Sequence, residues 1–169
     1  MRRISYYEKA VRRIGALMLG GLLTVGLCGC DEDEDNYLEG SMTDSYDFGF
    51  DSVRAVLYPS SVSIDYMKSK DGQPLFPCKV TINTPPSEIK TGVDYKIDGE
   101  EASLVQGAGY GTLELPPISS GKIRLDEFAG KAGSTVSGSF EALFTGSKGN
   151  ILNLRGGFNA KLIVPPGSN

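Results

Sequence analysis

The chain of 169 residues predicts an all-β protein, with a single antiparallel β-sandwich as its folded domain and a β-barrel as the alternative architecture. After residue 30, short runs alternate between apolar and polar residues with a period of two, as half-buried strands do. Clusters of Gly, Pro, Ser, Asn and Asp separate these runs, and no window has the apolar spacing of an amphipathic helix. Many short strands with turn signals between them are typical of sandwiches and barrels.

The first segment, residues 1–29, has the organisation of a secretory signal peptide. A region with five Lys and Arg residues precedes an uncharged apolar run of 14 residues at positions 14–27. A helix that crosses a bilayer needs about 20 apolar residues, so this run is too short for a permanent anchor. The sequence therefore predicts that residues 1–29 are removed during export.

The end of this segment reads Leu27-Cys28-Gly29-Cys30 and resembles the lipobox of bacterial lipoproteins, in which an aliphatic residue and two small residues precede a cysteine. The resemblance implies that the Cys30 thiol receives a diacylglycerol, that the signal is cut before Cys30, and that the new amine is acylated. Cys28 departs from the pattern, since Ala or Ser is commoner there. The alternative is an ordinary signal cut near Gly29, which would leave a soluble protein.

The second segment, residues 30–44, is expected to be a flexible tether that begins with five consecutive acidic residues at 31–35. Like charges repel and cannot pack, so this stretch should be solvated and would reach up to about 50 Å at ~3.3 Å per residue. An aspartate directly after the cysteine resembles the inner-membrane retention signal of enterobacterial lipoproteins. An acidic cluster resembles the surface-export signal of other Gram-negative groups. Of these two locations, we expect the protein to be anchored at the outer membrane or the cell surface.

The third segment, residues 45–169, is the predicted β domain. Its turn signals are rich in Gly, Pro, Asp and Ser, as turns between strands commonly are. The predicted strands cover residues 52–58, 62–67, 78–84, 93–97, 102–106, 111–115, 122–126, 135–145 and 150–164.

The last two predicted strands give the clearest pattern, because apolar residues occupy every second position in both. They form a predicted long hairpin with one face in the core and one in water. Gly138 and Gly156 interrupt the apolar faces and indicate a bend or a close backbone approach, with a possible bulge at Gly156-Gly157. The repeated pattern apolar-x-Gly-x-Phe-x-Ala resembles a C-terminal hairpin of secreted Gram-negative lipoproteins, in β-sandwich domains mostly without an assigned function.

Composition excludes several kinds of chemistry. The chain has no histidine, so no Ser-His or Cys-His nucleophile pair and no His-containing metal site can form. After removal of residues 1–29, 12 basic and 20 acidic residues remain, and five of the acidic ones belong to the tether. The domain is then nearly balanced in charge, which argues against nucleic acid as a partner. Cys78 is left without a disulfide partner and is expected to be a buried small hydrophobe.

Three groups of residues are weighed as binding or catalytic candidates. The glycine-rich loop at 106–111 carries Gly107, Gly109 and Tyr110; it lacks the lysine and helix of a phosphate loop but could be a contact loop. Carboxylates that could pair for acid–base catalysis are Asp94, Asp98, Glu100, Glu101, Glu114, Asp126 and Glu127. Tyrosines that could form a glycan-stacking surface are Tyr46, Tyr58, Tyr66, Tyr95 and Tyr110, although sheets favour tyrosine for structural reasons.

These observations predict a non-enzymatic, lipid-anchored protein of the cell envelope. The acyl chains on Cys30 would hold it to a membrane, and the β-sandwich would contact a protein or glycan partner. No cofactor and no metal are expected. The alternative is a periplasmic carrier that encloses a small apolar ligand in the β domain.

Overall fold

The computed structural model describes residues 35–107 and 114–165, which form nine strands and one short 3-10 helix. The predicted all-β class is confirmed. None of the described residues belongs to a helix long and apolar enough to cross a bilayer. The elements are β1 (Tyr37–Glu39), η1 (Ser41–Asp44), β2 (Ser52–Tyr58), β3 (Ser61–Lys70), β4 (Gln73–Ile82), β5 (Asp94–Lys96), β6 (Ala102–Val105), β7 (Ile118–Phe128), β8 (Thr135–Thr145) and β9 (Ile151–Ile163).

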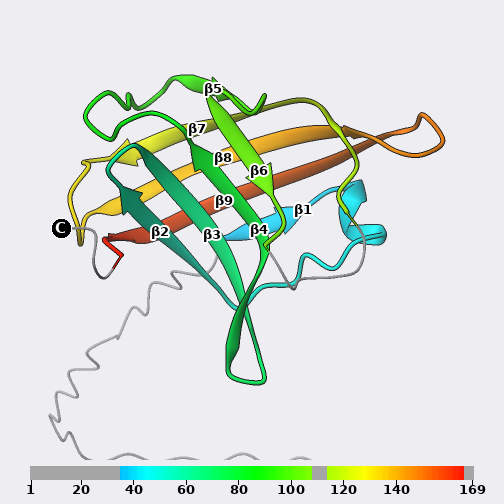
Figure 1. The fold of residues 1–169 in the computed structure, drawn as a ribbon, viewed down its shortest axis with the longest axis horizontal. Helices are drawn as coiled ribbons and strands as arrows, with labels where there is room; N and C mark the ends of the chain where they lie inside the picture. Colours follow the sequence, from blue (N-terminus) through cyan, green and yellow to red (C-terminus); the bar gives the residue numbers. More distant parts are fainter. Residues whose placement is uncertain (1–34, 108–113, 166–169) are drawn as a thin grey trace, which may run out of the picture. The chain divides into compact units, whose positions relative to one another are not determined.

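The strands form one continuous sheet in the order β5-β7-β8-β9-β2-β3-β4-β6, with β1 added to β9 (Figure 1). An isolated bridge between Ile97 and Ala102 joins the two ends of this path, so the sheet is nearly closed and barrel-like. The pairings between named strands are antiparallel except that of β2 with β9, which is parallel over two residue pairs. The Ile97–Ala102 bridge is parallel as well. The sheet therefore has the form of the barrel alternative, with two parallel contacts that the sequence did not predict.

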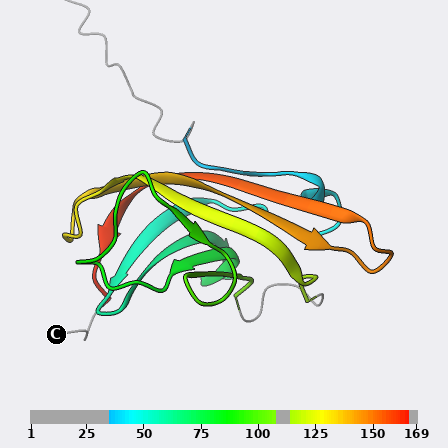
Figure 2. The ribbon, with the colours of Figure 1, turned by 90° about the horizontal axis from the view of Figure 1, so that it is seen from above.

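Figure 2 shows the sheet folded into two layers, with β7, β8 and β9 on one side and β2, β3 and β4 on the other. Apolar side chains from both layers fill the space between them, and the Tyr66 ring packs edge-on against Phe50 and Phe140. The largest fully buried side chains include Tyr66, Phe144, Phe158 and Met42. A packed core of this kind contributes about 25 cal/mol for each Å² of apolar surface removed from water.

The β8–β9 hairpin confirms the predicted alternation. Eleven residue pairs run from Thr135↔Lys161 to Thr145↔Ile151 without a register shift, so the bulge expected at Gly156-Gly157 is absent. These glycines instead allow close approach. A Cβ on Gly156 would overlap the Phe140 ring, and one on Gly157 would overlap the Tyr37 ring.

The folded domain begins before the predicted boundary at residue 45. β1 pairs with β9 through Tyr37↔Gly157, Leu38↔Gly156 and Glu39↔Arg155, and Met42 in η1 is fully buried. Ser41 Oγ donates to Asn153 Oδ1 at 2.9 Å, which fixes η1 to β9 as well. The predicted tether is therefore wrong for residues 37–44, because the apolar residues that follow the acidic run supply enough burial to dock on β9.

Other strand boundaries differ mainly in length. The predictions for β2 and β8 match end for end, whereas β3, β4 and β7 extend by several residues. The predicted strand at 111–115 has its first three residues outside the described part of the chain, and Glu114 and Leu115 are not in a strand. The turn between β3 and β4 uses Asp71 and Gly72, both with positive φ, as the predicted turn residues allow.

Candidate functional site

Several of the predicted site residues lie outside the described residues: the signal peptide, Cys30, Gly109 and Tyr110. Gly107 is described, and its N–H donates to the carbonyl oxygen of Phe76 at 2.8 Å. A Cβ on Gly107 would come within 2.6 Å of the Phe76 Cβ. The glycine is therefore required by the close contact between its backbone and β4.

The predicted carboxylates take separate structural roles. Asp98 accepts hydrogen bonds from the backbone N–H groups of Glu100 and Glu101 in the turn before β6, and these bonds lower its pKa. Asp94 on β5 pairs with two cations of β7 and belongs to the surface described below. Among the described residues, no group of three or more Cys, Asp or Glu side chains is arranged to hold a metal ion.

The four predicted tyrosines that the structure describes lie on different elements. Tyr66 is buried in the core, donates to the Gly157 carbonyl at 2.8 Å, and has its pKa raised mainly by burial. Tyr46 follows η1 and packs near Phe48, whereas Tyr95 on β5 accepts a hydrogen bond from the Lys90 N–H.

Cys78 is fully buried in β4, as expected for a small hydrophobe. Burial, and secondarily the charge of Asp65, raises the pKa of its thiol. Because the thiolate is the reactive form, this cysteine is protected from reaction in the folded protein.

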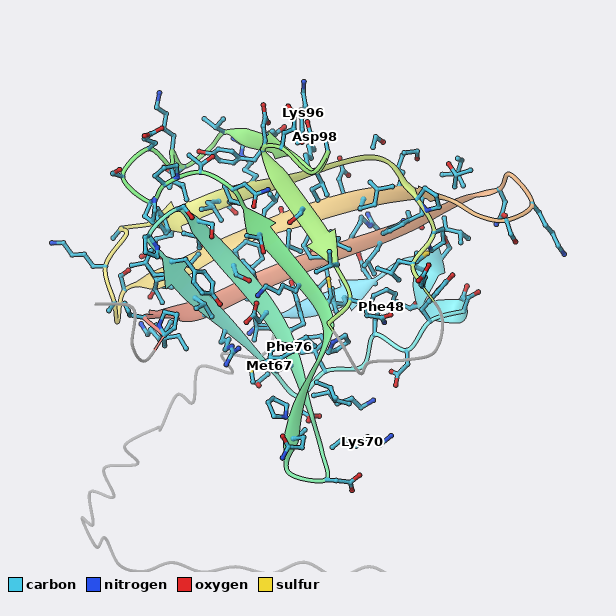
Figure 3. All side chains as sticks on the ribbon, in the orientation of Figure 1. Phe48, Met67, Lys70, Phe76, Lys96 and Asp98 are labelled. Carbon is cyan, nitrogen blue, oxygen red and sulfur yellow. The ribbon has the colours of Figure 1, made fainter. Side chains whose placement is uncertain are left out.

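A row of charged side chains crosses the outer face of the β7–β8–β9 layer from one side to the other. Direct cross-strand partners bring together Lys96, Lys122, Glu141, Arg155 and Glu39, which lie on β5, β7, β8, β9 and β1. Lys122 Nζ lies 3.5 Å from Glu141 Oε1, and an Arg155 terminal nitrogen lies 3.2 Å from Glu39 Oε1. Figure 3 shows Lys96 at the β5 end of this row, extending away from the core.

The neighbouring row has short side chains at its centre. Its cross-strand partners are Asp94, Arg124, Ser139, Gly157 and Tyr37. Asp94 lies 3.7 Å from Arg124 and also accepts a hydrogen bond from Lys122 at 3.2 Å, which raises the pKa of that lysine. The Tyr37 ring lies against Gly157, and only the short side chain of Ser139 stands between this ring and Arg124 in the row.

Two adjoining hollows of about 270 Å³ and 320 Å³ follow from this arrangement. Both are lined by Tyr37 and Ser139, so they lie side by side on this face, and we name the pair of hollows the outer groove. The first hollow is lined by Tyr37, Asp94, Lys122, Arg124, Ser139, Phe140, Glu141 and Arg155. The second is lined by Asp35, Tyr37, Asp126, Ser137, Gly138, Ser139, Gly157, Phe158 and Asn159.

A second groove of about 620 Å³ lies where β2 and β9 diverge. The two strands pair only at Ala55↔Leu162 and Val56↔Ile163, and their preceding residues line the groove together with Asn36. Its lining mixes apolar and polar side chains in similar proportion, and the described residues give no indication of what would cover it.

The outer face of the opposite layer carries a buried ion cluster. Asp65 on β3 lies between its cross-strand neighbours Arg54 and Lys79, at 3.0 and 3.7 Å. Arg54 also lies over the Phe76 ring and Lys79 over the Tyr58 ring, at 5.1 and 5.7 Å (Figure 3 labels Phe76). These contacts satisfy the buried carboxylate from both sides, so the cluster is a structural feature of the sheet.

Sequence reasoning missed Tyr37 because β1 has only three residues, too few for alternation to be recognised. The available signal was the change from an acidic run to the apolar pair Tyr37-Leu38, two residues before Gly40. Around Tyr37, half-exposed donors and acceptors face solvent and can bond a polar ligand.

No protein-family model, no curated protein and no solved structure matches this chain.

Proposed function

We propose that this chain is a lipid-anchored protein of the cell envelope, held at the outer membrane or cell surface by acyl chains on Cys30. It is non-enzymatic and presents its β domain to a protein or glycan partner. The signal-peptide organisation of residues 1–29 and the lipobox-like Leu27-Cys28-Gly29-Cys30 support the anchor. Two or more acyl chains on one residue would make the attachment stable, whereas one chain binds only marginally.

The outer groove is the observation that carries the partner-binding part of this proposal. Its aromatic ring and ionic side chains are half-exposed on a rigid, fully paired part of the sheet. Binding surfaces built on rigid strands lose little conformational entropy when a partner docks. The carrier alternative gains no comparable support, because large buried side chains fill the space between the two layers of the described sheet.

The position of β1 makes the tether much shorter than the sequence suggests. The Asn159 amide donates to Asp35 at 3.0 Å, and the Asn159 N–H donates to Asn36 Oδ1 at 2.8 Å, so the chain is already held at residue 35. The five steps from Cys30 to Asp35 span about 17 Å at ~3.3 Å per residue. A partner must therefore be reached close to the membrane surface.

Membrane fractionation of cells that express the wild-type chain, Cys30→Ala and Cys78→Ala tests the anchor. We expect the wild type and Cys78→Ala to sediment with membranes and to need detergent for release, and Cys30→Ala to be soluble. Sedimentation of Cys30→Ala with membranes would contradict the proposal. Protease treatment of intact cells then decides between the two faces of the outer membrane, because only a surface domain is cleaved before the membrane is opened.

A further inference from the structure

We infer that the outer groove binds a linear, uncharged glycan, with Tyr37 as the surface on which a sugar ring stacks. This inference rests on the proposed function, since it names the ligand class of the same surface. Four properties of the groove support it: an exposed aromatic ring, a low floor, paired charges in the first hollow and a second hollow next to the first.

Tyr37 supplies the aromatic surface. It is 41% exposed, and its backbone pairs with Gly157 from β1, the strand at the end of the row. The absence of a Cβ at Gly157 lets the tyrosine ring lie against the sheet, where a side chain at that position would overlap it. A ring held in this way presents apolar area at little entropic cost, and its hydroxyl adds a polar contact.

The floor beside Tyr37 is low enough for a flat ring to approach. Ser137, Gly138 and Ser139 of β8 line the groove, and none of them extends far from the backbone. The longer side chains of Arg124 and Glu141 stand at the border of the first hollow. A sugar ring can therefore contact the tyrosine ring and meet polar groups along its edge.

The charges around the groove favour an uncharged ligand. The second hollow is lined by two carboxylates, Asp35 and Asp126, and by no cation. In the first hollow, three cations (Lys122, Arg124, Arg155) pair with Asp94, Glu141 and the neighbouring Glu39, and each of these side chains is between 42% and 55% exposed. They offer donors and acceptors side by side, which matches the hydroxyl groups of a neutral sugar. An acidic polymer would meet the carboxylates and a basic peptide the cations, so either would be less complementary.

The outline of the groove favours a chain of sugars over a single one. The two hollows share Tyr37 and Ser139 and continue past them, toward Lys122 on one side and toward Asp126 on the other. A linear glycan can occupy both hollows while one of its rings stacks on Tyr37. Several weak contacts along a chain then add to a useful affinity.

The experiment measures binding of the full-length, detergent-purified protein to immobilised oligosaccharides. The neutral probes are linear β-glucan, xylan and mannan oligosaccharides, and the acidic probe is an oligogalacturonate. We expect binding to at least one neutral probe, a loss of about tenfold or more in affinity for Tyr37→Ala, and less than about threefold for Tyr37→Phe. Tyr58→Ala, on the opposite layer, is the matched control and should bind as the wild type does.

Ser139→Trp provides a second test that leaves Tyr37 in place. Ser139 is exposed and points outward, so a large side chain there fills the groove without entering the core. We expect it to lower the affinity as Tyr37→Ala does, while the thermal unfolding midpoint stays close to that of the wild type. Equal binding by Ser139→Trp and the wild type would overturn the site.

Three results would overturn the inference: no binding to any neutral probe, preferential binding to the acidic probe, or neutral binding that Tyr37→Ala leaves unchanged. The anchor is tested separately, because purified Cys30→Ala should retain glycan binding. If Cys30→Ala stays with membranes while glycan binding depends on Tyr37, the anchor fails and the groove inference stands. If the anchor is confirmed and glycan binding is absent, the ligand class is wrong and a protein partner on this face is left to the proposed function.

Discussion

Asp65 lies at the centre of β3 with its carboxylate withdrawn from solvent, although it is on the outer face of its layer. Its side chain is 1% exposed, accepts a hydrogen bond from Ser63 Oγ, and pairs with Arg54 and Lys79 on the two neighbouring strands. Both cations are about one third exposed, so water reaches them and not the carboxylate. A buried charge is tolerated only when such partners surround it.

We expect Asp65→Ala to lower the free energy of unfolding by about 3 kcal/mol, because it leaves two neighbouring cations and a buried hydroxyl without their acceptor. Asp94→Ala removes an equally paired but 42% exposed carboxylate, and should change the stability by less than ~1 kcal/mol. Urea unfolding followed by circular dichroism measures both. Equal effects of the two substitutions would show that burial of Asp65 adds nothing to the stability that its ion pairs provide.

β1 moves the start of the folded domain to a position before the predicted boundary at residue 45. It pairs with Gly156 and Gly157 of β9 and is followed by η1, where Met42 is fully buried. Deletion of residues 31–34 should leave the stability unchanged, since the acidic run precedes these contacts. Deletion of residues 31–42 should cost several kcal/mol, because a buried methionine alone contributes about 1.5–3 kcal/mol. Equal urea midpoints for the two deletions would show that residues 37–42 do not stabilise the domain and belong to the tether.

Sequence reasoning predicted the long strands β8 and β9 correctly and missed the three-residue strand β1. The faces of β8 and β9 were predictable because eleven consecutive pairs keep Arg155 and Lys161 out of the core, and a slip of one residue would bury both. β1 was not predictable, since three residues carry no period and their pairing depends on the glycines of β9. The parallel β2–β9 contact was equally hidden, because no turn connects these strands and closure of the sheet brings them together.

The same limit applies to the candidate site. The carboxylate Glu141 and the cation Arg155 were correctly expected on the polar face, but nothing in their spacing shows that Lys122 and Glu39 complete the row. Tyr37 joins the groove only through β1. A site formed across five strands depends on the sheet order, which local patterns do not contain.

At the scale of the whole molecule, the proposed anchor and the early start of the fold together set the height of the domain above a membrane. With Cys30 lipidated, the chain allows about 17 Å before Asp35 is held against β9. The hairpin turn at Lys148 is exposed and Cys78 is buried, so a dye attached to Lys148→Cys marks one position. Energy transfer from this dye to labelled lipid then reports the distance between the domain and the bilayer.

We expect a flexible Gly/Ser insertion of about 15 residues after Asp31 to lower this transfer, because its average end-to-end length adds roughly 20 Å. An insertion of the same length in the β3–β4 turn, next to Gly72, lies within the domain and should leave the transfer nearly unchanged. Cys30→Ala should abolish the transfer altogether. If the tether insertion left the transfer unchanged while Cys30→Ala abolished it, a contact other than the tether would hold the domain at the bilayer, and the height would not be set by the position of β1.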